Sequence, residues 1–313
     1  MVHFRFQETA QDHKAQMGDP LRAAQGLPQL EARQCHHDVV IQEHRNQHQR
    51  TIDFFFLQRI QMHQIVEGDA FETLASLPTA SVDLVILDIP YGQTAAEWDK
   101  RPDLCRLWEL LVRIRRNKST PIIWFCTTKL GMAIANAAPK KVVLRHDLVW
   151  VKDNFSSPLR INKSPPARHE MLLVFSEAAP YYKRIDIPNA GKPYKHSRKR
   201  GTGSELFGIE CTKTDETNVN DGSRCATSVL EYPKPIKQNI KHSTPKPVEL
   251  YKFLIDRYCA DGGTVLDPFA GSFNSLAACL QCPGKRYIGI ELNAELCRQA
   301  RVEYGIEKGS QTV

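Results

Sequence analysis

Long hydrophobic runs are missing from this sequence of 313 residues. No apolar stretch approaches the roughly 18 residues that a membrane-spanning helix needs, so we expect no transmembrane segment. The first residues also lack the apolar core of a signal peptide, which argues against export. We therefore expect a cytoplasmic protein.

Regularly spaced metal ligands are missing as well. The nine cysteines follow no repeating spacing, as expected where thiols stay free in a reducing compartment. Cys279 and Cys282 have the spacing of a zinc-binding pair, but no second pair completes a site. They fall in an Ala- and Leu-rich helical stretch, which favours core packing. His44 and His48 lie one helical turn apart in a polar segment, which favours a solvated face. We predict no metal site.

Acidic residues are too few to balance the basic ones, and the formal net charge is +7. Residues 1–61 hold seven Lys or Arg and seven Asp or Glu, so the whole excess belongs to residues 62–313. A basic body indicates a polyanionic partner such as nucleic acid. With 42% hydrophobic and 25% charged residues, the composition is otherwise that of a globular protein.

Apolar periodicity is nearly absent from residues 1–61, which are rich in Gln and His. Such a segment offers little apolar surface to offset the entropy of ordering it, so we predict a poorly ordered extension. Only Phe54–Leu57 argues otherwise, because these side chains could pack on the body. We expect residues 1–61 to be dispensable and Met62 to be a candidate for the natural start of the protein.

From Met62 onward, predicted strands and helices alternate. Strands are expected over 64–69, 81–88, 121–126, 144–151, 170–175, 264–267 and 287–291. Helices are expected over 70–77, 101–115, 129–138, 247–258, 275–280 and 294–304. This order predicts an α/β protein with a doubly wound, mostly parallel sheet.

The alternation stops between residues 176 and 240, which are polar and contain a basic run over 192–200. It then resumes. The sequence therefore predicts one α/β domain, formed by residues 62–175 and 241–313, with a basic insertion between its halves.

A first candidate site is Asp88-Ile89-Pro90-Tyr91, at the end of a buried strand, where open α/β sheets bind ligands. The Asp88 carboxylate and the Pro90 carbonyl offer two acceptors for the two N–H groups of an aromatic amine. The Tyr91 ring offers a surface on which such an aromatic ring stacks. Taken alone the tetrapeptide is weak evidence.

A second candidate site combines residues 265–272 with Glu291. The first is a strand that runs into a turn of small residues before a helix, where backbone N–H groups approach a ligand closely. Glu291 ends the next strand, where an acidic side chain commonly accepts hydrogen bonds from ribose hydroxyls. The pair indicates a cofactor that contains a nucleoside.

Together these motifs resemble those of the DNA amino-methyltransferases, the family that modifies adenine N6 or cytosine N4. Residues 88–91 are similar to its catalytic Asp-Pro-Pro-Tyr motif, and residues 267–272 to its cofactor loop. Residues 242–247 resemble its His-Pro-Thr-Gln-Lys-Pro segment, and residues 286–293 match its second cofactor strand. The likeness spans residues 62–305 apart from the insertion.

The order of the motifs resembles the circularly permuted β group, in which the catalytic motif precedes the cofactor loop. In that group the insertion between them is the target recognition region. The resemblance implies the class I S-adenosylmethionine-dependent methyltransferase fold, with a seven-stranded sheet that has one antiparallel strand.

The resemblance also implies the reaction and its residues. The expected cofactor is S-adenosylmethionine, and the expected partner is double-stranded DNA from which the target base is flipped, as in restriction-modification systems. Asp88 would hold the target amine, the Pro90 carbonyl would accept its second N–H, and Tyr91 would stack on the base. The expected cofactor-binding residues are Asp69, Thr244, Lys246, Asp267, Phe269, Gly271, Ser272 and Glu291. The expected DNA contacts are Lys192, Lys195, Arg198, Lys199 and Arg200.

Several alternatives stay open. Asp88 favours adenine, because the family often has Ser at that position when cytosine N4 is the target. Ile89 replaces a Pro of the motif without changing the proposed roles. Phe273 replaces a Gly, and if the position needs a positive φ, a strain of about 1–3 kcal/mol weakens cofactor binding. A catalytically impaired DNA-binding relative is therefore a second class of function. His169-Glu170 is either a family signature near the target base or a buried structural pair, and a homodimer is an open alternative to a monomer.

Overall fold

The computed structural model describes residues 62–92, 99–154, 161–197, 217–235 and 244–306. The chain divides into two units, residues 1–59 and 60–313, and every described residue belongs to the second. The expectation for residues 1–61, the His44 and His48 pair included, lies outside the described residues.

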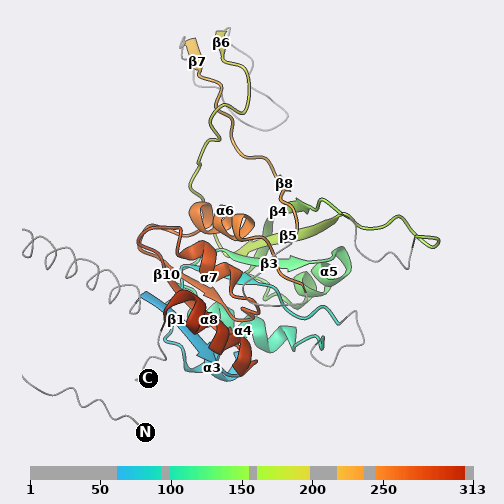
Figure 1. The fold of residues 1–313 in the computed structure, drawn as a ribbon, viewed down its shortest axis with the longest axis vertical. Helices are drawn as coiled ribbons and strands as arrows, with labels where there is room; N and C mark the ends of the chain where they lie inside the picture. Colours follow the sequence, from blue (N-terminus) through green and yellow to red (C-terminus); the bar gives the residue numbers. More distant parts are fainter. Residues whose placement is uncertain (1–61, 93–98, 155–160, 198–216, 236–243, 307–313) are drawn as a thin grey trace, which may run out of the picture. The chain divides into compact units, whose positions relative to one another are not determined.

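An eight-stranded sheet forms the centre of the second unit (Figure 1). Seven of its strands run parallel to one another, and β5 alone is antiparallel. Across the sheet the order is β1 (His63–Glu67), β10 (Arg286–Glu291), β9 (Thr264–Asp267), β2 (Leu84–Leu87), β3 (Ile122–Cys126), β5 (His169–Ser176), β4 (Val143–Val151) and β8 (Val229–Glu231).

The expected doubly wound, mostly parallel sheet is confirmed. Its seven predicted strands all form, at bounds within a few residues of the expected ones. The eighth strand, β8, comes from the segment expected as an insertion, where it pairs with β4 from Val149↔Val229 to Val151↔Glu231. Three residues carry too short a pattern to be recognised in the sequence.

Six helices within the described residues flank the sheet, and the residues before them explain where several begin. They are α3 (Ala70–Ser76), α4 (Leu104–Ile114), α5 (Thr128–Ala137), α6 (Val248–Tyr258), α7 (Asn274–Cys279) and α8 (Ala294–Tyr304). Asp69, Asp103, Thr127 and Asn293 each accept hydrogen bonds from backbone N–H groups of the first turn. These caps satisfy donors that a helix start otherwise leaves without partners.

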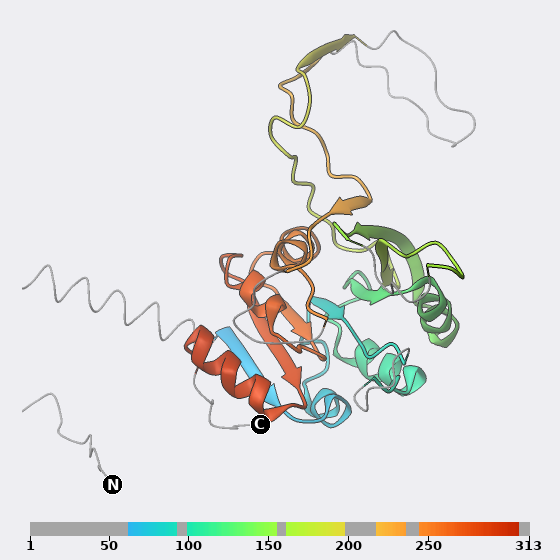
Figure 2. The same ribbon diagram turned by 45° about the vertical axis from the view of Figure 1, so that its right-hand side comes forward.

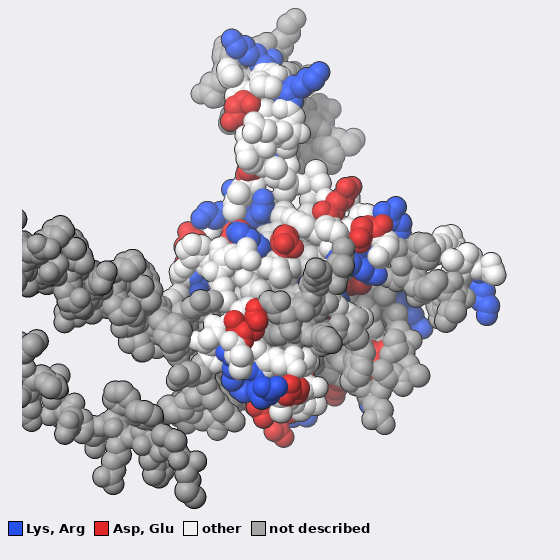
Figure 3. All heavy atoms as spheres, viewed as in Figure 1, with Lys and Arg blue, Asp and Glu red and all other residues white. Residues whose placement is uncertain are grey.

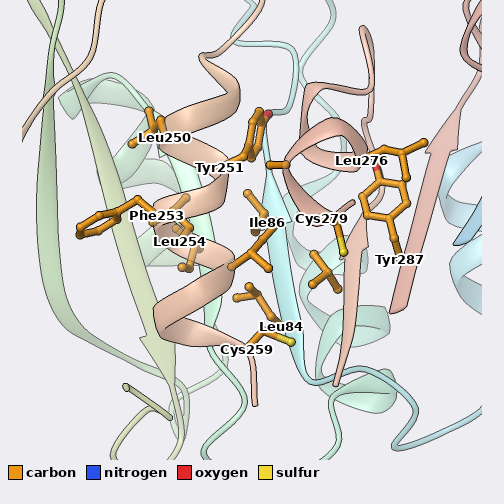
Figure 4. Packing of buried hydrophobic residues seen from close by; sticks show 14 of the residues in the cluster. Leu84, Ile86, Leu250, Tyr251, Phe253, Leu254, Cys259, Leu276, Cys279 and Tyr287 are labelled. Carbon is orange, nitrogen blue, oxygen red and sulfur yellow. The ribbon is translucent and has the colours of Figure 1, made fainter. Parts of the chain in front are cut away.

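Each face of the sheet carries its own hydrophobic core. In β2, Leu84 and Ile86 face the α6, α7 and α8 side, and Val85 and Leu87 face α3, α4 and α5, because successive side chains of a strand alternate. Figure 2 shows the two helical layers on opposite faces. Figure 4 shows the first core, in which Leu254 and Cys279 pack with Tyr287 and other apolar side chains.

The expected core packing of Cys279 and Cys282 is confirmed, because both are buried in this first core. Burial raises the pKa of the Cys282 thiol to about 12, so it stays protonated at neutral pH. Within the described ranges, no group of three or more metal-ligating side chains occurs. Within the same ranges, no helix has the length and apolar character to cross a membrane.

The connections of the sheet reverse direction between β2 and β9. From β9 the chain proceeds through α7 to β10, on one side of this point, whereas from β2 it proceeds through α4 to β3, on the other. Open α/β sheets bind ligands at such a reversal, beyond the carboxyl ends of the strands. Asp88, the first residue after β2, and Asp267, the last residue of β9, therefore flank this point.

Part of the expected insertion forms a separate antiparallel pair, β6 (Tyr194–Ser197) and β7 (Thr217–Asn220). Arg224 stabilises its base, since its guanidinium lies 5.1 Å from the Tyr194 ring centroid and donates to the Lys192 carbonyl at 2.7 Å. An antiparallel bridge between Ile187 and Arg224 continues the pairing. The polar segment therefore contains an ordered two-stranded element.

The backbone of Phe273 adopts the left-handed conformation that the replaced glycine of the motif suggests. Its φ is +57°, and its side chain is fully buried in the first core. A left-handed conformation costs a residue with a Cβ roughly 1–2 kcal/mol. The phenyl group thus turns into the core, and its burial offsets that strain.

We predict that Phe273→Gly destabilises the protein. Glycine relieves roughly 1–2 kcal/mol of strain but loosens the unfolded chain by about 0.5–1 kcal/mol. Emptying the phenyl site costs about 3–5 kcal/mol more, so the free energy of unfolding should fall by about 1.5–5 kcal/mol. Denaturant unfolding followed by circular dichroism measures it.

Ala80→Gly is the matched control, because Ala80 has φ +56° and is exposed. Its strain relief and its entropy cost nearly cancel, so we expect a change within about 1 kcal/mol. A Phe273→Gly protein as stable as the wild type would show that the phenyl group contributes nothing to the core.

Candidate active site

The strand directions bring the candidate residues to one edge of the sheet. Parallel strands end at the same edge, so Asp88 after β2, Asp267 at the end of β9 and Glu291 at the end of β10 share it. The antiparallel strand β5 starts where its neighbours end, and Glu170 therefore joins the same edge. Lys152 follows the last residue of β4.

The Asp88 carboxylate forms an ion pair with Lys246, 158 positions later in the chain. The Lys246 Nζ donates to Asp88 Oδ1 at 2.8 Å and to Oδ2 at 2.7 Å. Only 5% of the lysine side chain and 15% of the aspartate side chain are exposed. Asn274 donates to the Lys246 carbonyl at 2.7 Å and so fixes the segment that carries the lysine.

Tyr91 lies between two carboxylates. Its hydroxyl lies 3.0 Å from Glu170 Oε2 and 3.3 Å from Asp88 Oδ1, so its one proton is shared between the two carboxylates. Burial, and then the charges of Asp88 and Glu170, hold the pKa of Tyr91 well above its usual range. The phenol therefore remains a donor at neutral pH, and these bonds set the direction of its ring.

Glu170 connects this group to a second lysine. It forms an ion pair with Lys152, and the Lys246 Nζ lies 3.5 Å from its Oε2. Burial alone would raise the pKa of Glu170, but the two ammonium groups and the Tyr91 hydroxyl outweigh burial and hold that pKa below its usual range. Two carboxylates and two ammonium groups thus form one largely buried cluster of zero net charge, which we call the charge cluster (Asp88, Lys152, Glu170 and Lys246).

Asp267 shapes the loop that follows β9. Its Oδ2 accepts from the Ser275 hydroxyl at 2.6 Å, and its Oδ1 accepts from the Phe269 N–H at 3.1 Å. Burial raises its pKa to about 7, against the opposing effect of these bonds. With 1% of its surface exposed, Asp267 positions the loop from within the protein.

Glu291 holds the same loop from β10. Its Oε2 accepts from the Gly271 N–H at 2.9 Å, and its Oε1 accepts from the Asn293 N–H at 2.8 Å. Gly271 has a positive φ of 51°, a conformation that costs glycine little. The half-buried carboxylate has lone pairs beyond these two bonds, so it can still accept from a ligand.

Asp69 lies beside Glu291, because β1 pairs with β10 up to Glu67↔Glu291 and the Gly68 N–H donates to the Glu291 carbonyl at 3.0 Å. Both cap hydrogen bonds of α3 fall on Asp69 Oδ1, at 2.8 and 3.1 Å. Leu292 follows Glu291 directly and is 73% exposed.

The other candidate residues differ in how deeply they are buried. Ile89 is buried in the second core, which explains how it replaces the Pro of the motif, and Pro90 is half-buried beside it. Ser272 is buried, Phe269 is half-buried and Thr244 is exposed. Lys246, expected to contact the cofactor, also contacts Asp88, so it lies between the two groups of candidate residues.

Two of the five expected DNA contacts lie within the described residues. Lys192 and Lys195 are exposed, before and within β6. On the face shown in Figure 3, Lys and Arg side chains gather over β6 and β7. Arg198, Lys199 and Arg200 lie outside the described residues.

Comparisons with known proteins agree with this geometry. A family described as DNA methylase, N6_N4_Mtase, matches residues 82–302. The putative methylase YubD of Escherichia coli is 42% identical over 263 residues, which cover 80% of this chain and 95% of that protein. The DNA adenine methyltransferase YhdJ of Escherichia coli is 26% identical over 242 residues, 74% of this chain and 79% of that protein.

Solved structures share the fold. The cytosine-N4-specific PvuII DNA methyltransferase superposes with a TM-score of 0.56 at 12% identity, over 80% of this chain and 88% of that one. The Thermus thermophilus protein TTHA0409, a putative DNA modification methylase in complex with S-adenosyl-L-methionine, superposes with a TM-score of 0.51 at 21% identity, over 78% and 93%. At these identities the likeness concerns the fold alone.

We predict that Glu291→Ala weakens binding of S-adenosylmethionine. The variant loses a charged acceptor and the anchor of the Gly271 N–H, which together are worth roughly 1.5–3 kcal/mol. The dissociation constant from calorimetry should rise by about 10- to 100-fold. The rate at saturating cofactor should change much less.

Glu295→Ala is the matched control, because Glu295 is an exposed carboxylate of α8 paired with Arg298. It should leave the dissociation constant as in the wild type. An unchanged constant in Glu291→Ala would contradict the assignment of Glu291 to the cofactor.

Proposed function

The chain belongs to the N6/N4 family of DNA methylases, and within it we propose that this protein methylates the N6 amine of adenine at a specific DNA sequence. Membership makes the protein a DNA methyltransferase whose methyl donor is S-adenosylmethionine. The observation that supports the adenine assignment most is the placement of Asp88, a carboxylate, beside Tyr91 at the reversal of the sheet.

The residues at the edge of β1, β9 and β10 fit the donor. Glu291 has acceptor capacity left for ribose hydroxyls, and exposed Leu292 offers an apolar surface for the adenine ring. Asp69 would bind on the adenine side, while Phe269 and Gly271 would shape the methionine side, with Asp267 holding their loop. Ser272, Thr244 and Lys246 would line the same region. S-adenosylmethionine supplies an electrophilic methyl group on its sulfonium.

The residues after β2 act on the target amine. Asp88 accepts one N–H and draws electron density toward the nitrogen, whose lone pair becomes the nucleophile. The Pro90 carbonyl accepts the second N–H, and Tyr91 stacks on the flipped base. No covalent intermediate with the protein forms, so the chain contributes positioning and electrostatics.

We predict that Asp88→Ala abolishes methyl transfer while the dissociation constant of S-adenosylmethionine stays close to wild type. The reason is that Asp88 faces the amine, whereas the Asp267 loop and Glu291 hold the cofactor. Methylated DNA is digested to nucleosides and analysed by mass spectrometry, with N6-methyladenine expected from the wild type and none from the variant.

Retention of more than a tenth of wild-type kcat, a loss below about 1.4 kcal/mol, would contradict this role of Asp88. Detection of N4-methylcytosine in DNA treated with the wild type would identify cytosine, and not adenine, as the target base. No methylated nucleoside, with cofactor binding absent, would identify an impaired DNA-binding relative.

The segment between β5 and β8 supports a role in target recognition. It separates the catalytic half, residues 62–175, from the cofactor half, residues 241–313. Within residues 176–240, Lys192 is exposed before β6 and Lys195 is exposed within it. Lysines and arginines bind phosphates and position a protein on DNA. We assign the basic run from Lys192 to Arg200 to the DNA backbone of a double-stranded partner.

Replacing Lys195, Arg198, Lys199 and Arg200 by Ala should weaken DNA binding and flatten its salt dependence. Each lost phosphate contact lowers the slope of log K against log salt by about 0.9. Fluorescence anisotropy at several salt concentrations measures it. Lys140→Ala with Lys141→Ala, two exposed lysines after α5, is the control, and an equal slope in both variants would remove the run from the interface.

The cellular setting follows from the substrate. We propose that the enzyme works where DNA is accessible in the cytoplasm of a prokaryotic or virus-infected cell, as part of a restriction-modification system or alone. Analytical ultracentrifugation of the protein with and without DNA distinguishes a monomer from a homodimer.

A further inference from the structure

The charge cluster contains a conflict with the role of Asp88 just proposed. In the structure each Asp88 oxygen accepts a hydrogen bond from Lys246, at 2.8 and 2.7 Å. A neighbouring ammonium group lowers the electron density that the carboxylate offers to another donor. For Asp88 to polarise an amine, its hydrogen bonds with Lys246 must therefore weaken.

Glu170 is placed to resolve this conflict. Its Oε2 lies 3.5 Å from the Lys246 Nζ, longer than the 2.8 and 2.7 Å of the Asp88 contacts. If the ammonium moved by less than about 1 Å, Glu170 would become its main partner. The flexible four-carbon stem of lysine permits a movement of that size. The lysine also lies 5.5 Å from the Tyr91 ring centroid, so its position and that of the stacking ring are linked.

Among the described residues, Asp88 and Glu170 are the carboxylates that form ion pairs with Lys246. Only 5% of its side chain is exposed, so the lysine cannot turn to water without large cost. The Phe125 ring, 5.5 Å from the Nζ, packs on another side. The ion pair with Lys152 and the Tyr91 hydroxyl hold Glu170 in place.

We propose that Glu170 is a positioning residue that accepts Lys246 from Asp88 when the target amine enters, so that the Asp88 carboxylate is released to the amine. Glu170 itself does not touch the reacting atoms. The inference rests on the proposed function, because it assumes that Asp88 accepts an N–H of the amine. It also selects the site near the target base over a purely structural pair for His169-Glu170.

Glu170→Gln tests the proposal in the full-length protein. The amide has the size of the carboxylate and still accepts from Tyr91, but it carries no negative charge, so its attraction for Lys246 is much weaker and the lysine stays on Asp88. The single-turnover methylation rate at saturating DNA and S-adenosylmethionine should fall by about 100-fold, as for other misplacements of about 1 Å. The dissociation constant of S-adenosylmethionine should stay within about threefold.

A combined variant separates positioning from charge balance. Glu170→Gln leaves two lysines with one carboxylate, whereas Glu170→Gln with Lys152→Met restores zero net charge to the cluster. The proposal expects the rate of this double variant to remain low, because Lys246 still lacks its second partner. Recovery of the wild-type rate would mean that Glu170 only balances charge, and would overturn the proposal.

Glu170→Asp keeps the charge in case the other variants melt at much lower temperature. Its carboxylate is one methylene further from Lys246, so its rate should lie between those of the wild type and Glu170→Gln. A wild-type rate in either Glu170 variant, while the wild type itself methylates DNA, would overturn the proposal and leave the function intact. If the wild type methylates neither adenine nor cytosine amines, the proposed function itself has failed.

Discussion

The constraint on which the whole site depends is the direction of the strands. Because parallel strands end at one edge of the sheet, residues from distant parts of the chain arrive there together. The single antiparallel strand, β5, adds the start of a strand to that edge, which is how Glu170 meets Asp88 and Lys246. A parallel β5 would place Glu170 at the opposite edge.

The charge cluster is the energetic counterpart of this geometry. Burying four charges is costly, and removing one partner of a buried ion pair costs about 3–5 kcal/mol. The cluster is tolerated because its net charge is zero and its members hydrogen-bond one another. Within it, Lys246 lies closest to Asp88 and 3.5 Å from Glu170.

The loop after β9 contains a strained residue that its surroundings hold in place. Gly271 and Phe273 both have positive φ. Asp267 accepts a hydrogen bond from the Phe269 N–H of this loop. Glu291, at the end of β10, accepts one from its Gly271 N–H. The strained backbone at Phe273 persists because a fully buried phenyl group fastens it to the core.

Much of the fold was predictable, because its signals are local. Short segments of the chain carry these signals. They are the apolar runs of β2 and β3 and the helical spacing of apolar residues in α4. The Asp69 cap depends on its own next three residues. The strand β8, with three residues, was missed because its place is decided by pairing with β4 rather than by its pattern.

The sequence by itself determined the family, most of the strands and helices, and the identity of Asp88, Tyr91 and Glu291 as candidate site residues, since these lie in short motifs at strand ends. Only the tertiary structure decided that Lys246 pairs with Asp88 and that Glu170, 79 positions after Tyr91, binds its hydroxyl. The reason is physical: such contacts depend on the order and direction in which strands join the sheet. Hydrogen bonds between side chains so far apart in the chain leave no local pattern from which to predict them.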